Sequence, residues 1–405
     1  MADREVIETS DAFHTALGAL ASGTGPIAVD AERASGFRYS QRAYLIQMFR
    51  RGSGTFLFDP TALESFDTLN TVIASEEWIL HAATQDLTCL REVGLNPTRI
   101  FDTELASRLL GIPRVGLGAV VESVLGIHLA KEHSAADWST RPLPEAWLEY
   151  AALDVEHLPD LRDALILQLE EAGKTEIALQ EFADELTRNL VVTRSEPWRR
   201  LSGIHSLHDA KQRAVARELW LSRDALAREL DTAPGRLVPD SSLVAAASTL
   251  PPTKRALVEL SDFTGRATRR YLDRWFEAIE VGRASSDLPG PTQAGADTLP
   301  TLRLWPRRNP EADGRLKAAK EGLTQLSEEL NIPLENLLTP ETLRRLAWSP
   351  PTPLDMSTLA TELSKYHARP WQIDAVSPVI LAAFVDSQQF VDSQQRDDEV
   401  SSEVS

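Results

Sequence analysis

Short apolar runs separated by turn residues dominate the first half of the chain. The runs at 26–31, 43–49 and 54–59 have the length and composition of buried strands, and Gly52 and Gly54 near a turn indicate an antiparallel meander. Strands first, then strands alternating with helices, predict an α/β domain with a mixed sheet flanked by helices. The later strands are predicted at 78–83 and 99–102, and the helices at 61–74, 86–93, 104–110, 115–127 and 144–173.

The second half of the chain has helical periodicity and no strand pattern. Residues 207–282 are rich in alanine, leucine and arginine, and prolines divide them into short helices. A second helical stretch follows at 310–385. Sequence matches about 100 residues apart relate the two stretches, such as Leu237 with Leu337. A period of this length is too long for a solenoid repeat and favours duplicated domains.

These patterns divide the chain into five segments. The stretch between the two helical regions has the composition of a linker. The acidic tail contains FVDSQQ twice in succession and is predicted to be disordered. The predicted segments are the α/β domain at 1–190, an all-helical domain at 191–284, a linker at 285–309, a second helical domain at 310–385 and the tail at 386–405.

Composition narrows the class of protein. The chain has no run of about 18 apolar residues, which a membrane-spanning helix needs. Its polar, acidic start from Met1 to Thr9 is unlike a secretory signal. Cys89 is the only cysteine, which excludes an internal disulfide and a cysteine-rich zinc site. We therefore expect a cytoplasmic, reduced, monomeric protein with no membrane partner.

Charge is unevenly distributed along the chain. The net charge of −18 argues against nucleic-acid binding, because contact with phosphates requires a cationic surface. Residues 191–283, however, contain 16 basic and 12 acidic side chains. This basic excess is either a surface that binds nucleic acid or an ordinary solvated helical surface. Its cations include Arg199, Arg200, Lys211, Arg213, Arg217, Lys254, Arg255, Arg266, Arg269 and Arg270.

Candidate chemistry begins with acids on the first predicted strand. Asp30 and Glu32 are two residues apart, so their side chains project from the same face of the strand. Two neighbouring carboxylates repel each other unless a cation lies between them. The alternative is that the strand ends here and both acids are solvated.

Three further residues extend this pattern. Tyr150 and Asp154 are four residues apart on a predicted helix and therefore share one face. Asp86 follows a later strand, where it could also be a simple helix N-cap. Taken singly, each of these residues has an ordinary structural explanation. Their combination and order favour a carboxylate site for two hard divalent cations, Mg²⁺ or Mn²⁺, which can hydrolyse a phosphodiester.

The residues around these acids resemble a known family. The segments VDAE with LIQ, HAATQDL and YAALDV are similar to the three exonuclease motifs of the DEDDy 3′→5′ exonucleases, and 136–158 resembles ribonuclease D. The resemblance covers 22–175 and implies a ribonuclease H-like fold. It implies two metal ions held by the four acids, with Tyr150 positioning the attacking water. It further implies RNA as the partner, trimmed from the 3′ end to 5′-monophosphates, with transfer-RNA precursors among the substrates.

One position departs from the family pattern. The first motif often reads Asp-Thr-Glu, whereas this chain has Ala31 between the two acids. On a strand this side chain should face away from the metals, so we expect activity to be unaffected, with the loss of one possible hydroxyl contact to substrate.

Four other residues are candidate substrate or support residues. His81 could touch substrate or be structural, and Gln47 could support the metal site or satisfy a buried backbone group. Trp138 could stack on a base, or belong to the core. Arg141 could hold a phosphate, or pair with a nearby acid. Cys89 is expected to be buried packing.

The basic helical domain resembles an HRDC domain, a nucleic-acid-binding module, and the second helical domain resembles a divergent copy of it. This resemblance implies that the first domain holds structured RNA near the exonuclease. Two alternatives stay open: a 3′→5′ DNA exonuclease of the same fold, and a non-catalytic RNA-binding protein. The presence of all four acids and the tyrosine argues against the second.

Overall fold

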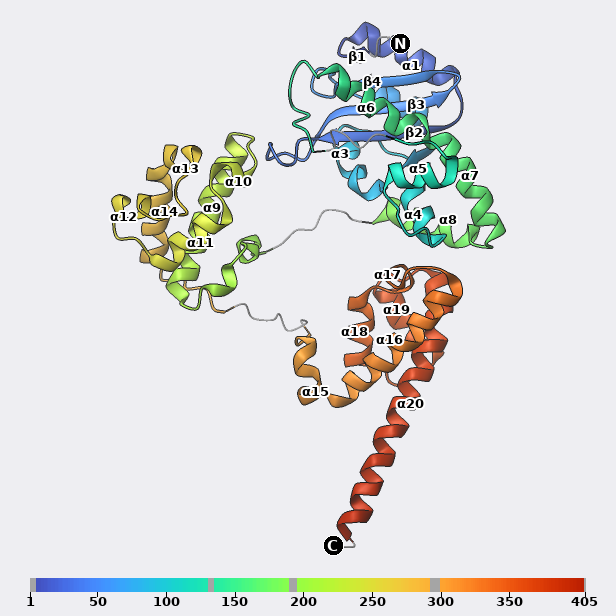
Figure 1. Cartoon of the computed structure of the whole chain (residues 1–405), viewed down its shortest axis with the longest axis vertical. Coiled ribbons are helices and arrows are strands. Elements are labelled where there is room, and N and C mark those ends of the chain that lie inside the picture. Colours follow the sequence, from blue (N-terminus) through green and yellow to red (C-terminus); the bar gives the residue numbers. More distant parts are fainter. Residues whose placement is uncertain (1–4, 130–134, 189–194, 292–298, 404–405) are drawn as a thin grey trace.

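The computed structural model describes residues 5–129, 135–188, 195–291 and 299–403, and for 388–403 it describes the backbone alone. Figure 1 shows three folded parts along the chain: an α/β domain, a helical domain around α9, and a second helical domain that ends in α20. In the described part of the chain, no helix is both long and apolar enough to cross a membrane.

The α/β domain is built on one mixed sheet of six strands in the order β1-β4-β3-β2-β5-β6. The predicted meander is confirmed, because β3 pairs antiparallel with both β2 and β4. The next strands, β5 and β6, continue the sheet in parallel with β2. The strands are β1 (Val6–Ile7), β2 (Thr24–Arg33), β3 (Ala43–Arg51), β4 (Gly54–Phe58), β5 (Glu77–Leu80) and β6 (Arg99–Asp102).

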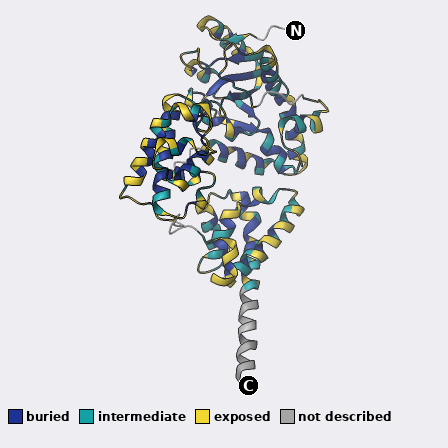
Figure 2. Cartoon of the chain, turned by 60° about the vertical axis from the view of Figure 1, so that its left-hand side comes forward, coloured by how far each residue is buried: buried dark blue, intermediate teal, exposed yellow. Residues whose placement is uncertain are grey.

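Helices cover both faces of this sheet, so its central strands are buried on both sides. Figure 2 shows buried residues concentrated along the strands and exposed ones on the outer helices. Helix α6 packs on β2, β3 and β4, whereas α7 packs on β2 and β5 and α8 packs on β6. The helices are α1 (Ser10–Ser22), α2 (Asp67–Ile73), α3 (Leu87–Glu92), α4 (Thr103–Leu109), α5 (Leu117–Leu125), α6 (Glu145–Glu156), α7 (Leu158–Glu171) and α8 (Thr175–Thr187).

The α/β domain departs from the sequence prediction in two places. The predicted helix at 144–173 is two helices, α6 and α7, because Pro159 has no N–H to continue the hydrogen-bond ladder. Strand β1 and helix α1 were not predicted. The two-residue strand is too short to give a pattern, although Thr9 is an N-cap that accepts from the Ala12 N–H.

The two helical domains repeat one order of elements. In each, a long helix is followed by a one-turn helix and a helix of nine or ten residues, and a long helix closes the domain. Before the closing helix, the first domain has two helices of five residues, whereas the second has one of ten residues. The duplication stays a prediction. The first contains α9 (Ala210–Glu229), α10 (Pro234–Leu237), α11 (Asp240–Thr249), α12 (Lys254–Val258), α13 (Arg266–Arg270) and α14 (Leu272–Ala284). The second contains α15 (Trp305–Arg308), α16 (Pro310–Leu330), α17 (Leu334–Leu337), α18 (Pro340–Trp348), α19 (Met356–Lys365) and α20 (Pro370–Glu403).

The predicted linker and tail differ from the structure. The second domain begins before residue 310, because Trp305 is fully buried and its ring lies 4.9 Å from that of Trp348. The middle of the predicted linker, 292–298, lies outside the described residues. The tail was predicted to be disordered, whereas helix α20 continues through it to Glu403.

Both helical domains contact the α/β domain through specific polar bonds. The hairpin between β2 and β3 meets the first domain: Asp231 accepts from the Ser40 N–H and the Tyr44 hydroxyl, and Phe37 O accepts from the Ala233 N–H. On α8, Glu181 accepts two bonds from Arg369 of the second domain. These contacts hold the three parts together around the α/β domain.

Candidate active site

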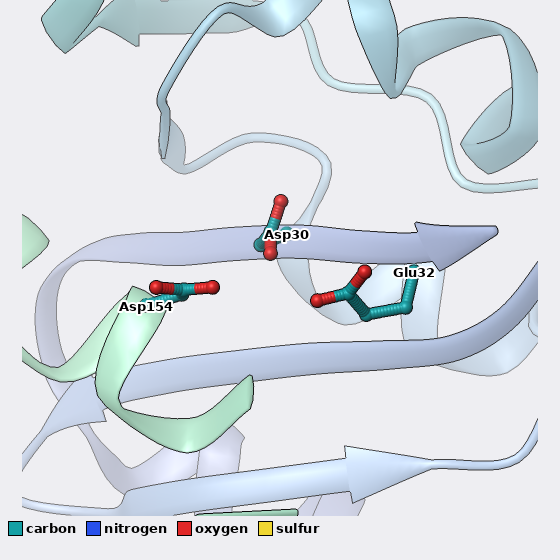
Figure 3. Close-up of side chains that lie close together, drawn as sticks. All are labelled: Asp30, Glu32 and Asp154. Atoms are coloured by element: carbon teal, nitrogen blue, oxygen red, sulfur yellow. The ribbon is translucent and has the colours of Figure 1, made fainter. Parts of the chain in front are cut away.

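Three of the predicted carboxylates lie close together in the structure. Asp30 and Glu32 on β2 and Asp154 on α6 each offer an oxygen within 4.8 Å of the others. Figure 3 shows the three side chains pointing toward one another, the first two from the strand and the third from the helix. The pairing of β2 with β3 and the packing of α6 on both strands fix this arrangement.

The fourth predicted acid, Asp86, lies beside Asp30. It precedes α3 in a loop that follows β5, and only 5% of the residue is exposed. Its side chain is hydrogen-bonded to that of Asp30. The guanidinium of Arg33 lies 3.5 Å from its Oδ1. The structure therefore brings all four acids together, with one arginine beside them.

Burial and mutual repulsion perturb these acids. Burial, reinforced by the neighbouring carboxylates, raises the pKa of Glu32 to about 10. Burial, followed by the charge of Asp30, raises the pKa of Asp154 to about 8. Burial also raises the pKa values of Asp30 and Asp86. The cluster thus lacks sufficient positive charge to be fully ionised near neutral pH, and a cation among the oxygens would remove this deficit.

Tyr150 lies one helical turn before Asp154 and its hydroxyl donates a hydrogen bond to that carboxylate. Burial and the charges of Asp154 and Glu32 raise the pKa of the Tyr150 phenol, so it stays protonated. A neutral hydroxyl at this place can orient a water molecule.

Gln47 supports the site from β3. It is fully buried and faces Asp30 across the ladder, and its Nε2 donates to Asp30 Oδ2 over 2.7 Å. Of the two interpretations made from sequence, the structure favours support of the carboxylate site.

His81 lines the cleft at the end of β5. Its Nδ1 lies 2.9 Å from Thr103 Oγ1, and the ring also has a hydrogen bond with the backbone of Val115. Burial lowers the pKa of this imidazole, so it is neutral.

Asp102 organises the loop that carries Asp86, a role that the sequence did not predict. Its buried carboxylate accepts from the N–H groups of Ala82 and Ala83 in that loop, over 3.0 and 2.6 Å. It also accepts from Glu104 and Leu105 as the N-cap of α4. The aspartate before TELASRLL was a visible N-cap signal, but its bonds to the loop depend on the pairing of β5 with β6.

Two predicted substrate contacts are corrected by the structure. Trp138 is fully buried against Trp147 and Tyr150, so it cannot stack on a base. Arg141 forms an ion pair with the buried Asp59 over 2.5 Å and donates to the carbonyl of Tyr44. In both cases the structural alternative accounts for the residue. Both side chains, in the segment before α6, are engaged by contacts within the protein.

Cys89 is buried, as expected. Burial raises the pKa of its thiol to about 12, which leaves no thiolate for nucleophilic chemistry.

The carboxylates open into a cleft of about 800 Å³. Five acids line it, and Arg33 is its only lysine or arginine among the described residues. A cleft of this size can admit the end of a polymer chain. Its acidic lining favours bound cations, which would in turn attract a negatively charged substrate.

The cations of the first helical domain are less available than the sequence suggested. Arg213 is buried on backbone carbonyls, while Arg217 pairs with Asp287 and Lys254 with Asp273. Among the described residues, three exposed arginines on α13 form no ion pair, and the last stacks 5.4 Å from the Tyr271 ring. These three are Arg266, Arg269 and Arg270.

Comparison with family models divides the chain as the fold does. A 3′-5′ exonuclease model matches residues 4–170, and an HRDC model matches 212–279. The second helical domain, predicted to be a divergent HRDC-like copy, matches the model of a 3′ to 5′ exonuclease C-terminal domain at 298–384.

Comparison with individual proteins gives consistent results. Ribonuclease D of Gluconacetobacter diazotrophicus is 30% identical over 278 residues, which cover 67% of each chain. The crystal structure of a protein from Bifidobacterium adolescentis matches with a TM-score of 0.86 and 37% identity, covering 94% of this chain and 97% of that one. The crystal structure of Escherichia coli RNase D, an exoribonuclease involved in structured RNA processing, matches with a TM-score of 0.66 and 26% identity, covering 89% and 99%.

Proposed function

The chain belongs to the ribonuclease D family and is a 3′-5′ exoribonuclease, and from this premise we propose how its residues perform the reaction. The proposal is that two divalent cations, Mg²⁺ or Mn²⁺, bind among four acids and that RNA is shortened from its 3′ end with release of 5′-monophosphates. The metal-binding acids are Asp30, Glu32, Asp86 and Asp154.

The observation that carries this proposal is the charge deficit of the cluster. Three carboxylates each have an oxygen within 4.8 Å of the others, and burial together with the neighbouring carboxylates raises the pKa of Glu32 to about 10. Such a set of oxygens fits hard divalent cations, which prefer carboxylates. When bound, the cations would neutralise the negative charge that develops on the phosphate and would lower the pKa of the attacking water.

The remaining residues hold the reacting groups in place. Tyr150 presents its hydroxyl beside Asp154, where it orients the attacking water. Gln47 fixes one oxygen of Asp30 through its amide, and His81 presents a neutral imidazole to the cleft. Orientation of this kind lowers the barrier because the reactants lose less freedom in the transition state.

The first helical domain would hold structured RNA while its 3′ end enters the cleft. The support is the set of three exposed arginines on α13. This helix is hydrogen-bonded to α10, because the Thr268 hydroxyl donates to the Leu237 carbonyl. In turn, α10 contacts the β2–β3 hairpin through Arg236 and the Gly36 carbonyl. We propose transfer-RNA precursors with extra 3′ residues as the substrate class.

The test is degradation of matched substrates by the full chain. Single-stranded RNA, the same sequence as DNA, and a 3′-extended transfer RNA are incubated with Mg²⁺ or Mn²⁺, and the product ladder is read. We expect stepwise shortening of RNA, and a loss of more than about 100-fold in Asp154→Asn through loss of a metal ligand. The matched control is Asp160→Asn, an acid on α7 whose side chain is 65% exposed.

Three outcomes would contradict parts of the proposal. Retained activity in Asp154→Asn would overturn the site assignment. Degradation of DNA in preference to RNA would favour the alternative of a DNA exonuclease. If replacement of the three α13 arginines by glutamine slowed a short oligonucleotide as much as the extended transfer RNA, the proposed RNA platform would be wrong.

A further inference from the structure

A positive side chain lines the carboxylate cleft. Arg33 is the last residue of β2, directly after Glu32, and its side chain is 27% exposed. Its guanidinium lies 3.5 Å from Asp86 Oδ1. The first exonuclease-like motif, VDAE, ends at Glu32 and does not include this residue, and the reaction proposed above does not use it.

The position of Arg33 follows from an irregularity in the sheet. The β2–β3 ladder is regular from Asp30 to Glu32, and then the register shifts so that Arg33 faces Ala43. Such irregularities next to active sites redirect side chains. Here Arg33 reaches Asp86, which comes from the other neighbour of β2, the loop after β5.

The charge around Arg33 would change when the site fills. Arg33 is an ion-pair partner of Asp86, and its guanidinium offsets part of the charge of that carboxylate. Two divalent cations would offset the four carboxylates, so Asp86 would no longer need the guanidinium. An arginine keeps its charge at any physiological pH and presents a planar set of donors that matches phosphate oxygens.

We propose that Arg33, which lies beside Asp86, is a phosphate-binding residue of the exonuclease site and binds the RNA backbone when divalent cations offset the charge of the carboxylates. This inference rests on the proposed function. Arg33 is the only lysine or arginine among the described residues that line the cleft, so a backbone phosphate that enters the cleft can meet its guanidinium.

The experiment measures binding of a short oligoribonucleotide by fluorescence anisotropy, with Ca²⁺ in place of the catalytic cations and RNA integrity checked on a gel. Arg33→Gln removes the charge and keeps most of the side-chain length. We expect affinity to fall about tenfold, as for loss of one charge-assisted hydrogen bond. The slope of log K against log salt should decrease by about 0.7, the value for one phosphate contact on a single strand.

A second measurement follows divalent cations alone. Mn²⁺ binding by calorimetry should tighten several-fold in Arg33→Gln, because a positive side chain no longer competes for Asp86. Arg33→Lys should keep the salt slope while recovering only part of the affinity, since it retains the charge without the planar fork.

The matched control is Arg99→Gln. This exposed arginine is the first residue of β6, whereas Asp102 is the last. Its guanidinium donates to the Ser75 carbonyl. It should change neither binding curve.

An unchanged salt slope in Arg33→Gln would overturn the inference. Weaker Mn²⁺ binding would overturn it too, because it would show that Arg33 only supports Asp86. Failure of the proposed function is distinguishable, since the wild-type chain would then show no cation-dependent RNA degradation.

Discussion

Replacing Asp102 by alanine should both destabilise the α/β domain and slow catalysis. The change removes one buried carboxylate that accepts four backbone N–H bonds. Loss of the α4 cap costs about 1 kcal/mol. Each loop amide left without a partner costs about 1 kcal/mol more. We therefore expect the free energy of unfolding to fall by about 3 kcal/mol.

The catalytic effect comes from the loop that holds Asp86. Without bonds to Ala82 and Ala83, the loop loses its anchor to β6, and a shift of about 1 Å in a reacting group can cost about 100-fold in rate. Urea unfolding followed by circular dichroism measures the first effect, and kcat on single-stranded RNA measures the second.

Leu69→Ala separates these two effects. Leu69 is fully buried on α2, away from the cleft, and its truncation costs about 2–5 kcal/mol. It should match Asp102→Ala in lost stability and keep kcat at a temperature where both variants are folded. The reasoning is refuted if Asp102→Ala keeps wild-type kcat, or if Leu69→Ala loses kcat equally.

Three other changes test the site and the domain contacts. Tyr150→Phe should lower kcat about 100-fold and leave thermal stability nearly unchanged, because only the hydroxyl beside Asp154 is lost; an unchanged kcat would remove the tyrosine from the mechanism. The pKa values of Glu32 and Asp154 lie above those of an unfolded chain, so the folded metal-free protein binds more protons and its stability should fall as the pH rises from about 5 toward 10. Mg²⁺ needs the ionised acids, so its stabilising effect, measured as the difference in Tm with and without the cation, should grow over the same range, and a constant difference would contradict the assignment. Glu181→Ala should cost about 3–5 kcal/mol and release the second helical domain to limited proteolysis, since Arg369 and the Trp371 indole lose a buried partner; resistance equal to wild type would show that other contacts suffice.

Local patterns accounted for most of the α/β domain. The apolar runs of β2 and β3 were readable because most of their residues are buried on both faces of the sheet, and the run of β4 ends in two buried residues, Leu57 and Phe58. The acids of the site were readable because Asp30 and Glu32 interrupt such a run, and because Tyr150 and Asp154 share a helix face.

What could not be predicted depends on contacts between distant segments. Trp138 and Arg141 have the chemistry of substrate-binding residues, and only packing against α6 and β3 makes them structural. Asp102 and Arg33 act on residues that lie near them only after the sheet forms. The cations of the first helical domain were visible, but their ion pairs within the fold were not.

The β2–β3 hairpin, which docks the first helical domain, limits how this protein can change through evolution. It lies between Glu32 and Gln47, so a mutation that loosens Asp231 from Ser40 acts on a segment whose two ends hold the carboxylate site. If recombination exchanged the first helical domain alone, the new domain would meet a β2–β3 hairpin whose contact residues had not evolved with it. We therefore expect hairpin and domain to covary across relatives, with Tyr39 and Asp224 changing as a pair.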